Sequence, residues 1–306
     1  MAEPVVSVVV PVYCEASHLA ESLSRILAAA VGLGVGVELI VVDDGSGDDT
    51  WSLLRAFAER HPEVRSLRLS RNFGKEAAIC AGLDAAVGRA VIVMDADLQH
   101  PPELIPKLVE AWRSGSAEVV EGVKVGAEGR PSASLGSRLF SRLLRALSGY
   151  DLEGASDFKL LDRRVIDEWR RLGESDTFFR GMVAWLGFRR VEVPFEVPPR
   201  SSGATRWSLR KRVKLALNAI AAFSSLPLHL VTVLGTLLFV VSFALAVQAF
   251  VAKVQGRALE GFTTVIIMLF FVGSGIMLSL GVIGIYVARI YNEVKRRPRY
   301  VVAERV

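Results

Sequence analysis

The sequence predicts an α/β domain with a mainly parallel sheet, followed by two apolar segments that are long enough to span a membrane. In the first 125 residues, β-branched runs alternate with amphipathic stretches at the spacing of strand–helix–strand units. Two of the expected strands end in acidic residues, at Asp43–Asp44 and at Asp95–Asp97. Beyond Leu226 the chain becomes strongly apolar. We therefore expect a globular domain joined to a membrane anchor.

Strands and helices are expected to follow one another in regular order. Apolar and β-branched runs predict strands at Val5–Val12, Val37–Val42, Val64–Leu69, Val91–Met94, Ala117–Val125, a short segment at Phe158, and Phe188–Val193. Apolar periodicity and capping residues predict helices at Glu15–Ala30, Glu76–Ala86, Ser132–Leu147 and Trp207–Phe223. A further helix is expected to follow the acidic turn 43–50 and to end at Phe57, and another is expected to begin at Glu103. The two acidic strand ends then lie at the same edge of the sheet, where α/β proteins bind ligands.

The acidic end of the fourth strand is the feature around which the rest of the chain is interpreted. Asp95 and Asp97 are separated by one residue in an extended segment, so their carboxylates lie on the same side of it. Two hard oxygen ligands suit Mg²⁺ or Mn²⁺, and such a cation suits a diphosphate. The alternative is that both aspartates only make turn contacts. The second acidic strand end at the same edge favours a ligand site.

Composition and charge narrow the class of protein. Hydrophobic residues make up 51% of the chain and the mean hydropathy is +0.38, which is high for a purely soluble protein. The formal charge of +5 comes from Arg and Lys clustered beside the apolar segments, which indicates lipid head groups or phosphates as partners. The sequence has no nucleic-acid-binding motif, so nucleic acid is not an expected partner. Cys14 and Cys80 are expected to be reduced core thiols, and no signal peptide is recognisable.

The last part of the chain is expected to form a membrane hairpin. The runs Leu230–Val247 and Phe262–Ala288 carry no charge, and about 20 residues suffice for one crossing. A buried core hairpin is the alternative. Basic clusters flank the pair of runs, whereas the loop between them has only Lys253 and Arg257 as cations. By the positive-inside rule, both termini and the α/β domain are then cytoplasmic, at the inner or plasma membrane.

The predicted chain has four parts. These are a cytoplasmic α/β domain 1–205, a basic interfacial helix 206–225, a hairpin 226–290 with spans at about 228–252 and 262–288, and a cytoplasmic basic tail 291–306. Glycines in the second span predict close packing against the first span or against another copy of the chain, which leaves a homo-oligomer open. The helix at Ser132–Leu147 is either core-facing or interfacial.

Five motifs occur in order before the apolar segments. They are Val10–Pro11–Val12–Tyr13 with Glu15, Val42–Asp43–Asp44–Gly45–Ser46 with Asp49–Thr50, Leu69–Ser70–Arg71–Asn72–Phe73–Gly74–Lys75, Met94–Asp95–Ala96–Asp97–Leu98–Gln99–His100–Pro101 and Asp157–Phe158–Lys159–Leu160. Together they resemble the polyprenyl-phosphate glycosyltransferases of glycosyltransferase family 2, which include the bactoprenol glucosyltransferases and dolichyl-phosphate mannose synthase. The resemblance covers nearly the whole chain. It implies a GT-A fold and inverting transfer of one sugar from a nucleotide sugar to a polyprenyl phosphate such as undecaprenyl phosphate.

The resemblance also implies roles for individual residues. The expected nucleotide-sugar-binding residues are Pro11, Tyr13, Glu15, Asp43, Asp44, Asp95, Ala96, Lys124, Arg200 and Arg206, the last three meeting phosphate oxygens. Asp97 and Gln99, with Asp95, are expected to hold Mg²⁺ or Mn²⁺. The expected catalytic residues are Asp157, Asp97 and Lys159, while Arg138 and Lys159 are expected to meet the acceptor phosphate. The chain departs from the family at Cys14, usually Asn, and at Arg206, usually Lys.

The expected role of Asp157 follows from the chemistry of the acceptor. A phosphate monoester has a second pKa of about 6, so at neutral pH its oxygen attacks without a strong base. Asp157 is therefore expected to position the acceptor site, by holding Lys159 or Arg138, rather than to remove a proton. A helix-capping role for Asp157 is the alternative.

Several functional alternatives remain at the level of sequence. Glucose from UDP-glucose is the preferred donor because the two-span architecture resembles the bactoprenol glucosyltransferases; GDP-mannose or another UDP-sugar is the alternative. The processive Gln-x-x-Arg-Trp motif is absent, since Gly203 precedes Ala204–Thr205–Arg206–Trp207. A scaffold without activity is disfavoured because the metal carboxylates are present. A transferase with a soluble acceptor remains open, and a transporter is disfavoured because the spans contain no charge.

Overall fold

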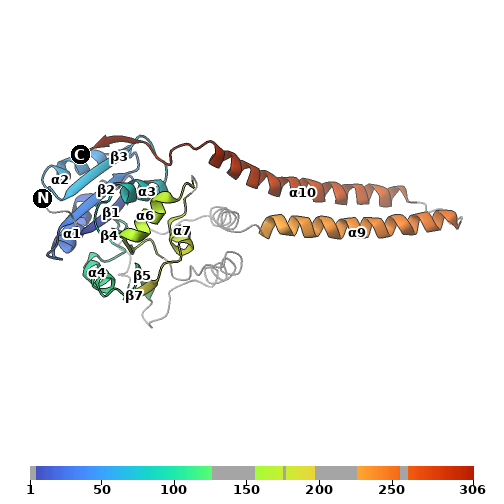
Figure 1. Ribbon diagram of the computed structural model, residues 1–306. Helices are drawn as coiled ribbons and strands as arrows, with labels where there is room; N and C mark the ends of the chain where they lie inside the picture. The colour runs from blue at the N-terminus through green and yellow to red at the C-terminus, as the bar shows by residue number, and fades with distance from the viewer. Residues whose placement is uncertain (1–4, 126–155, 175–176, 197–225, 256–260) are drawn as a thin grey trace. The chain divides into compact units, whose positions relative to one another are not determined.

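The structure of the protein is a computed structural model, which describes residues 5–125, 156–174, 177–196, 226–255 and 261–306 (Figure 1). The chain forms two compact units. The first contains the sheet domain together with the C-terminal residues from Arg296 onward, and the second contains the long apolar helices.

The first unit is built on an eight-stranded sheet with the order β7-β5-β6-β4-β1-β2-β3-β8. Its strands are β1 (Val6–Val12), β2 (Val37–Asp43), β3 (Val64–Leu69), β4 (Ala90–Val93), β5 (Val119–Val125), β6 (Lys159–Asp162), β7 (Arg190–Glu196) and β8 (Val302–Arg305). β1 to β4 pair in parallel with one another, and β5 pairs in parallel with β7. β6 and β8 are antiparallel to their neighbours. The predicted α/β domain with a mainly parallel sheet is confirmed.

Helices connect the strands and cover both faces of the sheet. They are α1 (Leu19–Val31), α2 (Thr50–Ala58), α3 (Lys75–Ala85), the short 3-10 turn η1 (Pro102–Leu104), α4 (Ile105–Arg113), α6 (Arg163–Arg171) and α7 (Phe179–Trp185). The helices expected at 132–147 and 207–223 lie outside the described residues. α7 was not expected from the sequence.

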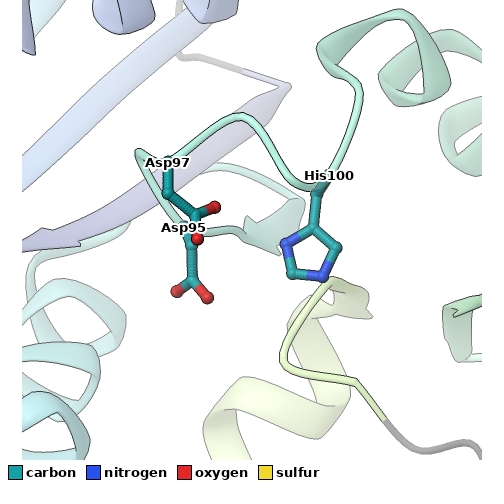
Figure 2. A group of neighbouring side chains, drawn as sticks. All are labelled: Asp95, Asp97 and His100. Atoms are coloured by element: carbon teal, nitrogen blue, oxygen red, sulfur yellow. The ribbon is translucent and has the colours of Figure 1, made fainter. Parts of the chain in front are cut away.

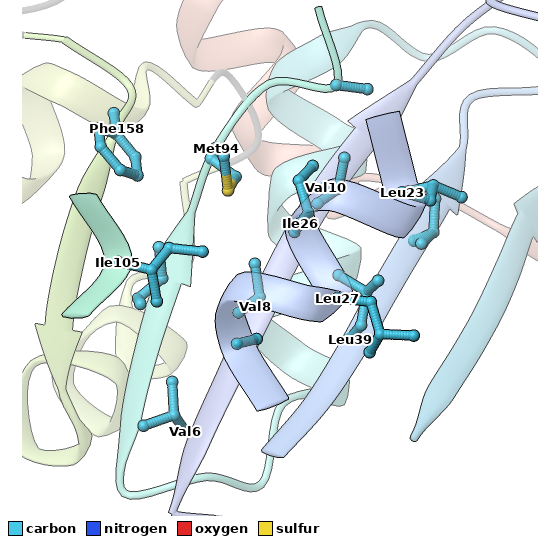
Figure 3. Packing of buried hydrophobic residues seen from close by; sticks show 14 of the residues in the cluster. Val6, Val8, Val10, Leu23, Ile26, Leu27, Leu39, Met94, Ile105 and Phe158 are labelled. Carbon is cyan, nitrogen blue, oxygen red and sulfur yellow. The ribbon is translucent and has the colours of Figure 1, made fainter. Parts of the chain in front are cut away.

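One large hydrophobic cluster fixes α1 against the sheet. The predicted apolar face of α1, made by Leu19, Leu23, Ile26 and Leu27, is buried against β1, β2 and β4 (Figure 3). Alternate residues of β1 point into this cluster, whereas Val9 faces the other side of the sheet, where Gly82 of α3 packs closely against it. Burying a side chain such as Leu23 contributes about 1.5–3 kcal/mol. The sheet is thereby held rigidly between helices, and its edge can present functional groups.

Strand directions bring three segments to one edge of the sheet. Val12 pairs with Asp43, and Val9 pairs with Val93, so β2 and β4 both end beside the end of β1. β6 runs the opposite way, and its first residue, Lys159, pairs with Val93. The segment that precedes β6 therefore lies next to the segment that follows β4. This register places Asp157 close to Asp95.

The second unit contains two long apolar helices that pack side by side, α9 (Leu226–Val254) and α10 (Phe262–Val294) (Figure 1). Leu269 and Met277 of α10 are 74% and 68% exposed, which is unusual for large apolar residues in a soluble protein. Within the described residues, one window, Phe271–Val294, is long and apolar enough to cross a membrane. The two-span hairpin remains a prediction.

Candidate active site

The carboxyl edge of the sheet carries a cleft of about 280 Å³. Its lining residues come from the ends of β1, β2 and β4 and from the start of α3. They are Pro11, Val12, Tyr13, Glu15, Asp44, Asn72, Gly74, Lys75, Ala78, Asp95 and Asp97. Six of these were predicted for the nucleotide or the metal. The cleft is lined by carboxylates and by one lysine, so a ligand that carries phosphate groups needs a cation here.

The loop after β4 contains three possible metal ligands (Figure 2). Ligand atoms of Asp95, Asp97 and His100 all lie within 4.8 Å of one another. Carboxylate oxygens are the ligands that Mg²⁺ and Mn²⁺ prefer, and imidazole is a common ligand for transition metals. The donor set therefore fits a divalent cation of this kind. Sequence reasoning named Gln99 and did not name His100.

The loop between β4 and η1, residues 94–101, is named the metal loop and has a constrained backbone. The main-chain N–H of Gln99 donates to Asp97 Oδ1 at 3.0 Å. Leu98 has a φ of +55°, in the left-handed region that a leucine rarely adopts. His100 is buried and stacks on Phe158, with ring centroids 5.2 Å apart. These contacts hold the loop in one shape, and the metal role of the Gln99 side chain remains a prediction.

Glu15 is an acidic group of the cleft that interacts with Asp95 and Asp97. Its pKa is raised to about 7, chiefly by burial and then by the nearby carboxylates of Asp97 and Asp95, while Lys75 opposes this rise. Mutual repulsion of three carboxylates is relieved when a cation binds among them. The electrostatics of the cleft thus agree with the donor set in favouring a divalent cation.

The acidic end of β2 organises the opposite side of the cleft. Asp44 accepts the main-chain N–H groups of Phe73 and Gly74 at 2.7 and 2.9 Å, which ties it to the start of α3. Burial raises the pKa of Asp44, and these two N–H donors oppose that effect. Asp43 is fully buried and accepts the N–H of Ser46 at 3.0 Å. Asp43 therefore shapes the loop instead of lining the cleft, contrary to the direct contact that was expected.

Cys14 lies in the turn beside Tyr13. Its N–H donates to Ser46 Oγ at 2.8 Å, and its φ is +54°. Asparagine tolerates this left-handed conformation better than other side chains, which gives a physical reason for the residue that the family usually has here. The expectation of two core thiols is half right. Cys14 is exposed, whereas Cys80 is buried and its pKa is raised to about 11 by burial.

Asp157 is held by two cations at the end of the cleft. Arg180 of α7 donates to it from Nε at 2.6 Å and from Nη2 at 3.0 Å, and Lys75 Nζ donates at 2.7 Å. Lys75 also lies 2.6 Å from Asp95, so it bridges the metal loop and Asp157. Burial favours the neutral acid, but Arg180 and Lys75 outweigh it and hold the pKa of Asp157 far below its usual range. Asp157 is therefore ionised and is a weak base.

Lys159 does not reach the cleft. Its side chain is 2% exposed and forms an ion pair with the equally buried Glu121. Burial lowers the pKa of Lys159, and Glu121 partly offsets this effect. The expectation that Asp157 holds Lys159 is wrong, because its partners in the described chain are Lys75 and Arg180. The acceptor role predicted for Lys159 is untested, but its burial argues against direct contact with a phosphate.

Several other predicted residues are not brought to the cleft or not described. Ala96, between the two aspartates of the metal loop, is buried. Arg138, Arg200 and Arg206 lie outside the described residues, as does the side chain of Lys124, whose backbone belongs to β5. The roles of these four residues remain predictions.

Sequence reasoning missed Lys75 and Arg180 as members of the site. Lys75 lies within a quoted motif but was given no role. Arg180 follows the residues Phe178 and Phe179, with no neighbouring motif to mark it. The position of Lys75 directly after Gly74, at the first turn of a helix that starts at the sheet edge, was a signal that could have found it.

Comparison with known proteins agrees with this geometry. The model of the family described as "Glycosyl transferase family 2" matches residues 7–169. An uncharacterized glycosyltransferase of Synechocystis sp. is 36% identical over 301 residues, covering 97% of this chain and 94% of that protein. The SfII prophage-derived bactoprenol glucosyl transferase of Shigella flexneri is 33% identical over 300 residues, covering 97% of each chain.

Solved structures give a looser likeness. The mannosyltransferase PcManGT from Pyrobaculum calidifontis, in complex with GDP-Man and Mn²⁺, is 21% identical with a TM-score of 0.47, covering 92% of this chain and 88% of that chain. The glucosyl-3-phosphoglycerate synthase from Mycobacterium tuberculosis is 24% identical with a TM-score of 0.48, covering 72% and 78%. The family model, by contrast, matches more than half of the chain, and relatives above 30% identity cover nearly its full length. The chain therefore belongs to glycosyl transferase family 2 and is a glycosyltransferase.

Proposed function

We propose that this enzyme transfers one glucosyl residue from UDP-glucose to the phosphate of a membrane polyprenyl phosphate, with inversion at the anomeric carbon. One observation carries the proposal. The match to the bactoprenol glucosyl transferase of Shigella flexneri covers 97% of both chains, and so extends over the cleft domain and the apolar helices alike. The preference for glucose and for undecaprenyl phosphate follows from that relative.

The donor occupies the cleft between the β1 turn and the metal loop. Pro11, Tyr13 and Asp44 surround the base and ribose, and Asp95 and Asp97 face the diphosphate. When bound, Mg²⁺ or Mn²⁺ neutralises the charge that develops on the departing diphosphate. Lys124, Arg200 and Arg206 are proposed to supply further positive charge to the phosphates.

The acceptor phosphate attacks from the side of Asp157. A new bond forms between the anomeric carbon and a phosphate oxygen of the lipid, while the bond to the nucleoside diphosphate breaks and the diphosphate leaves with the electron pair. The attacking oxygen is already ionised near neutral pH, so no base is required. Asp157 fixes Lys75 and Arg180, whose side chains are 42% and 39% exposed and can meet an anion. The ion network thus positions the acceptor.

The apolar helices are proposed to hold the enzyme at the lipid. Both α9 and α10 are taken to cross the inner or plasma membrane, with the sheet domain, the tail and the N-terminus on the cytoplasmic side, where nucleotide sugars occur. A homo-oligomer formed through these helices is compatible with the glycines of α10.

A transfer assay tests the proposal. Full-length protein in lipid nanodiscs is incubated with undecaprenyl phosphate, Mn²⁺ and either radiolabelled UDP-glucose or radiolabelled GDP-mannose, with Asp97→Ala as the inactive control. We expect label from UDP-glucose to move into the organic phase. Label from GDP-mannose instead would overturn the donor, and an aqueous labelled product would overturn the lipid acceptor.

A further inference from the structure

The chain that follows α10 returns to the sheet and completes its edge. β8 pairs antiparallel with β3, so that Arg305 lies opposite Leu67 and Glu304 lies opposite Arg68. Ser66 and Val306 exchange main-chain hydrogen bonds of 2.9 and 3.0 Å, which extends the ladder by one pair. The backbone of this segment thus pairs along β3, with an irregularity between Arg68 and Leu69, and forms the edge of the sheet that is separated from β4 by β1, β2 and β3.

Two side chains of the domain donate hydrogen bonds to the Glu304 carboxylate. Trp51 Nε1 donates to one of its oxygens at 3.1 Å, and Arg68 Nη1 donates to the other at 3.0 Å. The Arg68 guanidinium lies over the Trp51 ring, with Cζ 5.8 Å from the ring centroid. Trp51 is buried and fixed in the core of the domain. Glu304, which is held by the buried Trp51 side chain, therefore fixes the orientation of the Arg68 guanidinium.

The rest of the Arg68 guanidinium holds the loop that follows β2. Nη2 donates to the carbonyl oxygen of Ser46 at 3.3 Å, and Nε lies 3.5 Å from Asp43 Oδ2. Asp43 is fully buried, and a buried carboxylate is costly unless a cation compensates it. Arg68 is the cation that the described structure places against it. The loop conformation therefore depends on where Arg68 points.

That loop forms one wall of the cleft. Asp44 lies in the wall and ties it to α3, and Ser46 Oγ accepts the N–H of Cys14, next to Tyr13. Hydrogen bonds and one ion pair thus connect Glu304 through Arg68 to the residues that face the base and ribose in the proposed function.

We propose that Glu304 is a positioning residue for nucleotide binding, and that the segment after α10 thereby tunes the affinity of the cleft for a nucleoside diphosphate. This inference rests on the proposed function for the identity of the ligand. The alternative is that Glu304 forms only a surface ion pair that has no effect on the cleft, because exposed ion pairs contribute little to stability by themselves. The two accounts differ in what happens to nucleotide affinity when only the carboxylate is neutralised.

The test uses Glu304→Gln in the full-length protein in nanodiscs. The amide keeps the size of the side chain and leaves the backbone ladder of β8 intact. Calorimetric titration with UDP and Mn²⁺, and in parallel with GDP and Mn²⁺, gives the dissociation constant of each nucleotide. We expect the nucleotide that binds wild type to bind the variant about 3–10-fold more weakly, the low end of coupling between sites. KM for the nucleotide sugar should rise similarly, with kcat within about twofold of wild type.

Two further variants separate positioning from general damage. Arg305→Gln alters a neighbouring exposed residue of the same strand and should leave the dissociation constant unchanged. In an Arg68→Gln background, Glu304→Gln should have no further effect, because the connection is already broken. Unfolding midpoints of all variants are measured to confirm that the domain is folded.

Each outcome decides the matter. Unchanged nucleotide affinity in Glu304→Gln would overturn the inference while leaving the proposed function intact. An equal loss in Arg305→Gln, or additive losses with Arg68→Gln, would show that strand docking in general is responsible and would also overturn it. Wild type that binds neither UDP nor GDP would refute the proposed function, and this inference with it.

Discussion

Replacing Asp157 by asparagine separates two roles that a carboxylate beside an acceptor can have. Asp157 is 6% exposed in its side chain and receives two hydrogen bonds from Arg180 and one from Lys75. Its pKa is depressed, so its stabilising effect is complete above the ordinary value of about 3.9 and is lost only as the pH falls through the lower folded value. Between about pH 5 and 8, Asp157 does not titrate. An acidic limb in that range must come from another group.

The effect of Asp157→Asn on the free energy of unfolding follows from these hydrogen bonds. A hydrogen bond to a charged group contributes about 1.5–3 kcal/mol when buried. The partner side chains are 42% and 39% exposed, so solvent screens part of this, and the asparagine oxygen keeps one acceptor. We expect the free energy of unfolding to fall by about 1–3 kcal/mol. If Asp157 were a base, the rate would also fall by on the order of 10²–10⁴-fold.

The assay is the initial rate of lipid-linked product as a function of pH, with acceptor concentration varied. We expect an acidic limb near the second phosphate pKa of about 6 to survive in Asp157→Asn, with the loss appearing as a higher KM for the acceptor. Glu15 and Glu76, whose pKa values are raised to about 7 mainly by burial, also titrate there. Glu76→Gln, which still accepts the N–H of Phe179, is the matched control. Loss of the limb in Asp157→Asn alone, with acceptor affinity unchanged, would refute the positioning role.

Three more predictions follow from the described residues and from the proposed topology. Asp97→Ala should remove the Mn²⁺-dependent part of nucleotide affinity in calorimetry while leaving the unfolding midpoint within a few degrees; full affinity in the variant or in excess chelator would contradict the metal assignment. In a Cys14→Ser background, a cysteine within 254–261 should react with an impermeant thiol reagent from outside the cell, and one near Arg299 should not; the reverse pattern would place the domain away from nucleotide sugars. Cys14→Asn should raise the free energy of unfolding by up to about 1 kcal/mol in denaturant titration, because φ is +54°, and a decrease would show that the thiol is needed for packing.

Local patterns were enough to predict the half of the fold that carries the cleft. The β-branched runs of β1, β2 and β4 have a single interpretation, and parallel pairing then brings the acidic ends at Asp44 and Asp95 together without further information. The apolar face of α1 was likewise readable from its periodicity. The cleft residues Pro11, Tyr13 and Glu15 came from motifs alone.

Features that depend on distant pairing were not predictable in this way. β8 has four residues, alternates poorly and follows a basic cluster, so nothing local marks it as a strand. Lys159 was expected at the acceptor because of the family resemblance, but Glu121, from another strand, forms an ion pair with it within the core. Arg180 enters the site only because α7 packs near Asp157. Each of these outcomes was decided by a partner far away in sequence.

The place of β8 in the sheet has a consequence for biosynthesis. Residues 302–305 leave the ribosome after both apolar helices, yet they form the edge next to β3, whose own residues were made more than 230 positions earlier. Until then, β3 exposes unpaired main-chain groups, and Trp51 and Arg68 lack the Glu304 carboxylate. The sheet is therefore finished only after both apolar helices have been synthesised, so the domain that carries the cleft cannot complete its edge before that point.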